Sequence, residues 1–300
     1  MRSGCAALFK IIKTKLKKQK SPHILITGVS TGIGYGCVQQ FLLKGYRVIG
    51  SVRNQADADK LKKEFGDNFT PIIFDVTDAA AVKNSFALVE KTTEGKGLCG
   101  LINNAGIALG GNIQDMPVEK FRQHFEVNVF GLFYVTQTFL PLLGACENHP
   151  SLPGKIINIS SVNGKIATPF VGAYVASKHA VEGLSHSLRR ELLMYDIDVV
   201  IVAPGPVQTP IWEKGMDITG YENSAYYSAF KKMTTYLSGV KHQGLTIEGI
   251  SKTILNIFEK EKPRTRYALL NGKFANLTIP RLLPDRVLDN IFGKQLGFKK

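Results

Sequence analysis

Short apolar runs alternate along this chain with longer amphipathic segments, and that alternation restricts the fold more than any other feature. The runs are rich in β-branched residues and almost free of charge, as in HILIT at 23–27 and KIINIS at 155–160. Such runs are typical of parallel strands that are covered on both faces. The pattern predicts a single α/β domain, a Rossmann-type doubly wound parallel sheet with helices on both faces. Strands are expected at 23–27, 46–51, 71–75, 98–103, 155–160 and 197–202, with helices near 33–44, 56–65, 78–94, 119–143 and 173–195.

Length and composition fit one globular unit. The chain has 300 residues, of which 44% are hydrophobic and 21% are charged. No apolar run approaches the roughly 18 residues of a membrane-spanning helix. The cysteines are scattered and form no CxxC pair, so we expect neither a metal site nor a disulfide framework, and we expect a reducing compartment. These cysteines are Cys5, Cys37, Cys99 and Cys146.

The net charge of +14 lies entirely at the two ends of the chain. Residues 1–23 carry seven basic side chains and no acid, and residues 262–300 carry nine basic side chains and two acids. The neutral body has no stripe of alternating basic and aromatic residues, so we expect no nucleic-acid partner. We divide the chain into a basic N-terminal segment (1–22), a main domain (23–270) that includes a long loop (205–245), and a basic C-terminal tail (271–300).

A glycine-rich turn follows the first predicted strand. Residues 27–34 read TGVSTGIG and lead into a predicted helix. Residues without Cβ allow a pyrophosphate to approach the backbone at a helix N-terminus. The turn therefore predicts dinucleotide binding, with contacts from Gly28, Ser30, Thr31, Gly32, Ile33 and Gly34.

The end of the second predicted strand indicates which dinucleotide binds. A carboxylate there would accept the ribose hydroxyls of NAD(H), but the first acid in the chain is Asp57, and Arg53 stands near that position. A guanidinium suits a 2′-phosphate, and Ser30 can add a hydroxyl donor. We therefore favour NADP(H) over NAD(H), with a solvated Arg53 as the alternative.

Tyr174 and Lys178 are spaced four residues apart, on one face of a predicted helix. A nearby cation stabilises a phenolate, which would bring the phenol towards acid–base work at neutral pH. Tyr227 and Lys231 have the same spacing. The first pair is distinguished by Ser161, which lies thirteen residues before Tyr174 and just past a predicted strand.

Together these motifs resemble the short-chain dehydrogenase/reductase family over about residues 23–270. The matching motifs are TGxxxGxG at 27–34, NNAG at 103–106, Asn128, Ser161, Tyr174 with Lys178, and the Pro204-Gly205 pair. The resemblance implies that Tyr174 is the general acid/base, assisted by Lys178, while Ser161 orients the substrate oxygen and Asn128 supports a proton relay. It also places further residues along the cofactor: Asp75, Val76, Asn103, Ala105, Gly106, Tyr174, Lys178, Pro204, Gly205, Val207 and Thr209.

The resemblance implies an NAD(P)-dependent enzyme that interconverts an alcohol and a carbonyl compound. Apolar and aromatic residues in the loop at 205–245 of this catalytic domain, which we call the substrate loop, favour a hydrophobic, lipid-like substrate such as a steroid, retinoid or fatty carbonyl. These residues are Ile211, Trp212, Met216, Tyr221, Tyr226, Tyr227, Phe230, Met233 and Tyr236. The tail resembles the hydroxysteroid and retinol dehydrogenase branch, so NAD-linked oxidation of such alcohols is an alternative, as is a catalytically silent dinucleotide-binding scaffold. The family also implies a homo-oligomer formed through helices near 119–143 and 173–195.

The N-terminal segment has the pattern of an amphipathic basic helix. Leu8, Phe9 and Ile12 fall on one helical stripe, with Lys13 and Lys17 on the opposite side. Such a helix binds at the surface of an anionic membrane. We therefore expect a peripheral protein on the cytoplasmic side of a membrane, with a mitochondrial presequence or a soluble basic tail as the alternatives.

Overall fold

The structure, a computed structural model, describes residues 23–298 except 148, 150, 212–214, 216 and 243. The predicted N-terminal amphipathic helix therefore lies outside the described residues, as do Trp212 and Met216 of the substrate loop. No helix among the described residues is long and apolar enough to cross a membrane.

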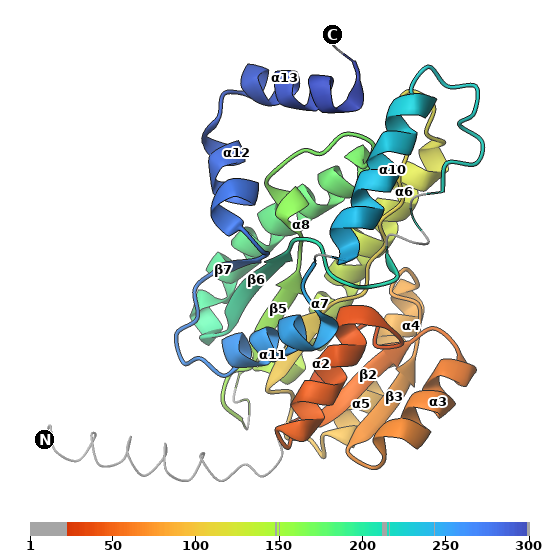
Figure 1. The fold of residues 1–300 in the computed structure, drawn as a ribbon. Coiled ribbons are helices and arrows are strands. Elements are labelled where there is room, and N and C mark those ends of the chain that lie inside the picture. Colours follow the sequence, from red (N-terminus) through yellow and green to blue (C-terminus); the bar gives the residue numbers. More distant parts are fainter. Residues whose placement is uncertain are drawn as a thin grey trace, which may run out of the picture.

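Seven parallel strands form one sheet in the order β3-β2-β1-β4-β5-β6-β7 (Figure 1). The strand order reverses between β1 and β4, and ligands of doubly wound sheets bind at the carboxyl ends of the strands beside this point. The strands are β1 (His23–Ile26), β2 (Arg47–Val52), β3 (Phe69–Ile73), β4 (Gly100–Asn103), β5 (Lys155–Ile159), β6 (Asp198–Pro204) and β7 (Arg266–Leu269).

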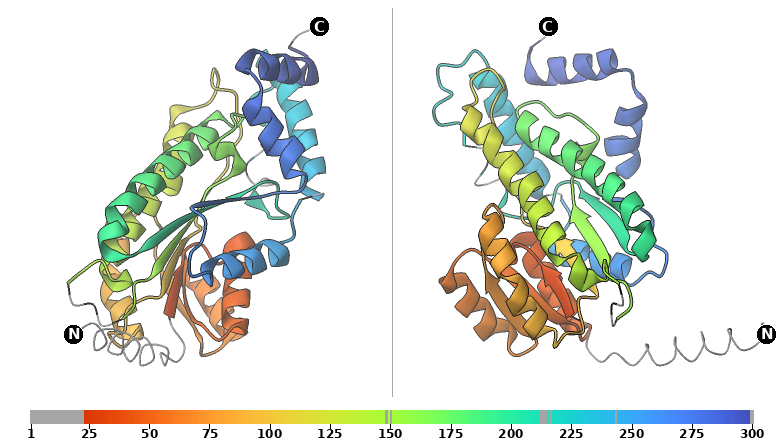
Figure 2. Two further views of the ribbon diagram at one scale, coloured as in Figure 1. Left: turned by 90° about the vertical axis from the view of Figure 1, so that its left-hand side faces the viewer. Right: turned by 180° about the vertical axis from the view of Figure 1, so that it is seen from behind.

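Helices cover both faces of this sheet (Figure 2), which confirms the predicted fold class. On one face, a buried cluster joins the strands to α2 (Gly32–Leu43), α3 (Gln55–Phe65) and α11 (Ile247–Phe258). On the other, a second cluster joins them to helices of the central part of the chain. These helices are α4 (Ala79–Asn84), α5 (Phe86–Thr92), α7 (Gly131–Phe139) and α8 (Gly172–Glu191).

The structure differs from the expected elements in the helices near 78–94 and 119–143. The first is two helices that meet at Ser85, whose hydroxyl donates to the carbonyl oxygen of Val82 at 2.6 Å. The second is divided into α6 (Val118–Phe125), a π-helical turn η1 (Glu126–Phe130), α7 and a 3₁₀ turn η2 (Pro141–Leu143). Single π turns are frequent at functional sites, and this one carries Asn128.

The C-terminal segment is part of the fold, contrary to its division from the catalytic domain as a tail. We call residues 271–298 the C-terminal arm. It contains a π turn η5 (Phe274–Thr278), α12 (Ile279–Leu282) and α13 (Asp285–Leu296). Leu296 is buried in a cluster with Phe230 and Met233 of α10 (Tyr227–His242), so α13 packs on a helix of the substrate loop (Figure 1).

Candidate active site

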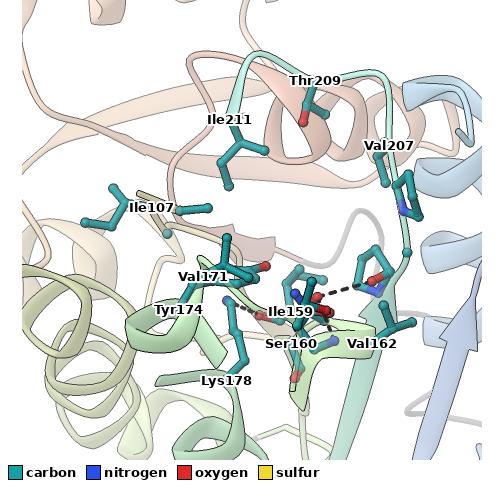
Figure 3. Close-up of a pocket in the computed structure, with 18 of the residues that line it drawn as sticks. Ile107, Ile159, Ser160, Val162, Val171, Tyr174, Lys178, Val207, Thr209 and Ile211 are labelled. Carbon is teal, nitrogen blue, oxygen red and sulfur yellow. Dashed lines mark hydrogen bonds between the residues drawn. The ribbon is translucent and has the colours of Figure 1, made fainter. Parts of the chain in front are cut away.

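One cavity of about 1630 Å³ opens at the carboxyl ends of the strands. It runs from Arg53 beside β2, past Tyr174 of α8, to Phe292 of the C-terminal arm. Figure 3 shows its central part, where Tyr174 and Lys178 face the loop that follows β5. The cavity therefore joins the predicted cofactor site to the predicted substrate side.

The glycine turn has the conformation that the sequence requires. Gly28 and Gly32 have φ of +67° and +64°, a region that side chains with a Cβ disfavour. A Cβ at Gly28 would lie 2.9 Å from the Cα of Ala105, and one at Gly34 only 2.4 Å from the oxygen of Gly28. Thr31 makes no side-chain cap on α2, so the first backbone N–H groups of this helix are available to a phosphate.

Arg53 and Asp75 lie at the end of the cavity where the adenosine half of a dinucleotide is expected. Arg53 is exposed, lines the cavity, and has no ion-pair or hydrogen-bond partner among the residues that the structure describes. The Asp75 carboxylate accepts hydrogen bonds from the backbone N–H and the hydroxyl of Thr77, at 2.9 and 2.8 Å. These bonds fix a rigid loop next to a free guanidinium.

The two asparagines of the NNAG motif have different surroundings. Asn103 does not line the cavity; its side chain donates to Thr136 and Asn158 in the interior, both at 2.9 Å. This corrects the expected placement of Asn103 beside the cofactor, because the pleat at the end of β4 turns its side chain inward. Asn104, the second asparagine of the motif, lines the cavity and donates to the carbonyl oxygens of Thr27 and Gly28, at 2.9 and 3.0 Å. Asn104 therefore joins the β4 loop to the glycine turn.

Tyr174 and Ser161 meet across the cavity, and their side chains are hydrogen-bonded. Ser161 lies two residues after β5 and caps the 3₁₀ turn η3 (Val162–Gly164) by accepting the N–H of Asn163 at 3.1 Å. Ser160 bonds instead to Glu182, at 3.2 Å. The geometry therefore places Ser161, the residue preferred by spacing, beside the phenol.

The pKa of Tyr174 differs from the sequence-based expectation. Burial raises the pKa of this phenol to about 12, and the hydrogen bond with Ser161 only opposes that rise. The reason is geometric, because the Lys178 ammonium lies 5.7 Å from the centre of the tyrosine ring and donates to the carbonyl oxygen of Ile159 at 2.9 Å. In the protein alone, Tyr174 is therefore protonated at neutral pH.

Asn128 supports the floor of the site from the π turn. Its amide oxygen accepts the N–H of Ile107 at 2.8 Å, and its amide nitrogen donates to the Ile107 carbonyl and to the Ser177 hydroxyl, at 3.0 and 2.9 Å. All of its protein contacts are thus to the loop after β4 and to α8. Asn128 connects these two elements behind the reacting groups.

The remaining predicted cofactor residues follow β6 and β4. Thr209 lies against the glycine turn, with its methyl group 3.4 Å from where a Cβ on Gly32 would stand. The cavity is also lined by Val76, Ala105, Gly106, Pro204, Gly205 and Val207.

Sequence reasoning also missed Glu182, a buried acid with a 1% exposed side chain. It lies four residues after Lys178 on α8, and its carboxylate accepts from Ser160 and, at 2.8–3.0 Å, from Nε and Nη2 of Arg266 on β7. The Lys165 ammonium is 3.3 Å away. The spacing of Tyr174, Lys178 and Glu182 by four residues was the available signal, since it puts all three on one face of the helix.

We expect Lys178 to make stability depend on pH. Burial lowers the pKa of Lys178 to about 8 in the folded protein, whereas an unfolded lysine has a pKa of about 10.4. Between these values the unfolded chain binds more protons, so the free energy of unfolding should rise with pH, on the order of 3 kcal/mol in total. Urea unfolding at several pH values should show this rise in the wild type and not in Lys178→Met. Equal slopes for the two proteins would contradict the lowered pKa.

The fold and this cavity define a dinucleotide-dependent oxidoreductase, and comparisons with known proteins agree. The family model for short chain dehydrogenase matches residues 22–217. The chain is 39% identical over 275 residues to the NADPH-dependent 3-dehydrocapnine reductase of Ornithobacterium rhinotracheale, covering 91% of this chain and 97% of that protein. The chain therefore belongs to the short-chain dehydrogenase/reductase family, and it is an oxidoreductase of that family.

Other relatives give the same result. The human dehydrogenase/reductase SDR family member 9 is 35% identical over 198 residues, which cover 66% of this chain and 60% of that protein. A short-chain dehydrogenase from Streptomyces avermitilis superimposes with a TM-score of 0.76 at 26% identity, covering 92% of this chain and 98% of that one. The closed form of a serine dehydrogenase complexed with NADP⁺ gives a TM-score of 0.68 at 26% identity, with 83% and 94% covered.

Proposed function

We propose that this protein reduces a ketone or aldehyde group on an extended hydrophobic molecule, with NADPH as the preferred cofactor. The observation that carries the proposal is one continuous cavity. It begins at the unpaired guanidinium of Arg53, passes the Tyr174–Ser161 pair and continues into an apolar channel. The channel wall beyond the pair is formed by Met233, Leu237, Ile279, Leu283, Leu288, Ile291, Phe292 and Leu296.

The residues of the cavity fit a nicotinamide dinucleotide. The glycine turn and the start of α2 suit its pyrophosphate, and Arg53 with Ser30 suits a 2′-phosphate. When bound, the cofactor supplies the hydride. Ser161 holds the substrate carbonyl oxygen beside Tyr174, and Tyr174 donates its phenolic proton to that oxygen as the carbonyl is reduced. A phenol that is protonated at neutral pH can supply the proton that carbonyl reduction requires.

Substrate length is the second part of the proposal. Small-molecule sites commonly have volumes of roughly 300–1,000 Å³, whereas this cavity has about 1630 Å³ and must hold a dinucleotide as well as the substrate. The polar residues of α10 and the C-terminal segment that line the cavity are Lys232, Asn271, Asn276 and Gln295. An apolar chain of several carbons next to the carbonyl would fill this space.

The experiment is NADPH and NADH oxidation by the purified full chain with retinoid, steroid and fatty carbonyl compounds of increasing length. We expect kcat/KM to rise with apolar length and to be higher with NADPH. Equal rates for a short and a long carbonyl would overturn the substrate class, and faster turnover of the matching alcohols with NAD⁺ would favour the dehydrogenase alternative.

Arg53→Ala should weaken the binding of NADPH by roughly ten- to a hundredfold, because a charge-assisted hydrogen bond contributes about 1.5–3 kcal/mol. NADH binding should hardly change. Fluorescence titration of both cofactors would measure this. Arg47→Ala is the matched control, since Arg47 lies at the amino end of the same strand, away from the cavity, and pairs with Glu94. An equal loss for the two cofactors would show that Arg53 has a structural role instead.

We also propose that the family's homo-oligomer forms through α6, η1 and α7. Phe121, Phe130 and Phe133 are exposed there in the single chain. Large exposed aromatic groups on neighbouring turns are typical of a protein interface. Sedimentation analysis of the wild type and of Phe130→Asp would test this proposal.

A further inference from the structure

The C-terminal arm separates two cavities. Residues on one side of η5 and α12 line the main cavity: Ala275, Asn276, Ile279, Pro280 and Leu283. Residues on the other side line a second cavity of about 290 Å³, completed by β7: Arg266, Ala268, Lys273, Leu277, Thr278, Arg281 and Leu282. One short stretch of chain is therefore the common wall of the substrate channel and of a separate pocket.

The second cavity is strongly cationic. Arg266, Lys273 and Arg281 contribute three positive charges, and Thr278 adds a hydroxyl. Glu182 is the carboxylate that pairs with Arg266, and Lys165 is bound to it as well. No described carboxylate pairs with Lys273 or Arg281, so the cavity keeps an excess of positive charge. Guanidinium, ammonium and hydroxyl groups in this arrangement suit a phosphate.

Large apolar side chains stand exposed next to these cations. Phe274, which follows Lys273, is 71% exposed, and Leu282, which follows Arg281, is 78% exposed. Val287 and Phe298 of the arm are exposed as well, whereas Ile279 and Ile291 line the main cavity. Apolar groups interleaved with unpaired cations are the mark of a segment that lies in the interface of an anionic bilayer.

We propose that the C-terminal arm docks on the surface of an anionic membrane. A phospholipid phosphate lies in the second cavity among Arg266, Lys273 and Arg281, and Phe274 and Leu282 enter the acyl boundary beside it. Because the other side of the arm lines the main cavity, a substrate dissolved in the bilayer passes along the arm towards the active site. That last step rests on the proposed hydrophobic substrate, whereas the docking does not.

The test uses the full chain and a local readout, since residues 1–22 are basic as well. An environment-sensitive dye is attached to Leu282→Cys in one protein and to Leu43→Cys in another. Leu43 is 81% exposed and ends α2, four residues before the start of β2. Cys5 and Cys146 are replaced by serine, and burial raises the pKa of Cys37 and Cys99 to about 12, which keeps these thiols unreactive.

We expect vesicles of equimolar phosphatidylcholine and phosphatidylglycerol to shift the dye emission at position 282 to the blue, and vesicles of phosphatidylcholine alone to leave it unchanged. The double variant Lys273→Ala with Arg281→Ala should bind these vesicles roughly thirtyfold more weakly, since each charge near the surface contributes about 1 kcal/mol. The measured quantity is the lipid concentration that gives half of the maximal shift. Lys83→Ala with Lys91→Ala removes the same charge from α4 and α5 and should have little effect.

Three results would overturn the proposal. A shift at position 43 without one at position 282 would place the membrane next to the end of α2 and not next to the C-terminal arm. An equal response to vesicles of zwitterionic phosphatidylcholine would show that docking does not depend on anionic lipid. A response to soluble glycerol phosphate without any response to vesicles would show an anion site in place of a docking surface. No carbonyl substrate is present in these assays, so they stand apart from the test of the proposed reaction.

Discussion

Tyr174→Phe should lower kcat by roughly 10²–10⁴, because the variant keeps the packing of the ring and loses the one positioned proton donor beside Ser161. Binding of the dinucleotide should be largely kept, since the substitution leaves the glycine turn and Arg53 unchanged. Single-turnover reduction of a carbonyl substrate at saturating NADPH measures the chemical step directly.

The matched control is Tyr227→Phe. Tyr227 also stands four residues before a lysine, and it begins α10, but it does not line the main cavity. We expect this variant to retain nearly full activity. Similar losses in the two proteins would show that the phenol of Tyr174 has no special role.

Glu182→Ala should lower the free energy of unfolding by about 3–5 kcal/mol, the typical cost of leaving one partner of a buried ion pair alone. The substitution leaves Arg266 on β7 without its carboxylate partner and removes the acceptor of the Ser160 hydroxyl. Because β7 leads directly into the C-terminal arm, we expect the arm to lose protection from proteolysis as well. Urea unfolding and limited trypsin digestion measure the two effects.

Glu191→Ala is the control for that measurement, because Glu191 ends the same helix and is exposed. It should change stability by no more than about 0.5 kcal/mol. A double variant, Glu182→Leu with Arg266→Met, should recover most of the loss, since a buried ion pair can be replaced by apolar residues at little cost. A loss below about 1 kcal/mol in Glu182→Ala would contradict a buried, essential pair.

The sequence was sufficient for six of the seven strands and for most of the predicted site residues that line the main cavity. Six strands were predicted, because runs such as KIINIS at 155–160 are apolar on both faces, and the pattern of Gly28, Gly32 and Gly34 has few alternatives to a tight turn. β7 was missed because its four residues are only half-buried and pair with one neighbour, β6. A short edge strand that contains Arg266 has no periodic signal to detect.

Other features depended on contacts between distant residues. The inward side chain of Asn103 depends on Thr136 and Asn158, and the raised pKa of Tyr174 depends on how deeply α8 is buried. The arm resembled a basic tail because its apolar residues are widely spaced, and it is held by Leu296 against Met233, more than sixty residues earlier in the sequence. Local patterns do not record such pairings.

The wall of the main cavity is formed by residues on both sides of residue 217, and this has a consequence for how such enzymes diverge. The family model ends at residue 217, whereas α10 and the C-terminal arm, which form most of the apolar channel, lie after it. We therefore expect the part of the chain before residue 218 to vary less among relatives than the apolar channel wall that follows it. Two relatives with the same redox residues can then accept unlike molecules. Exchanging residues 218–298 between them should transfer substrate preference while leaving the choice of cofactor with residues 23–217.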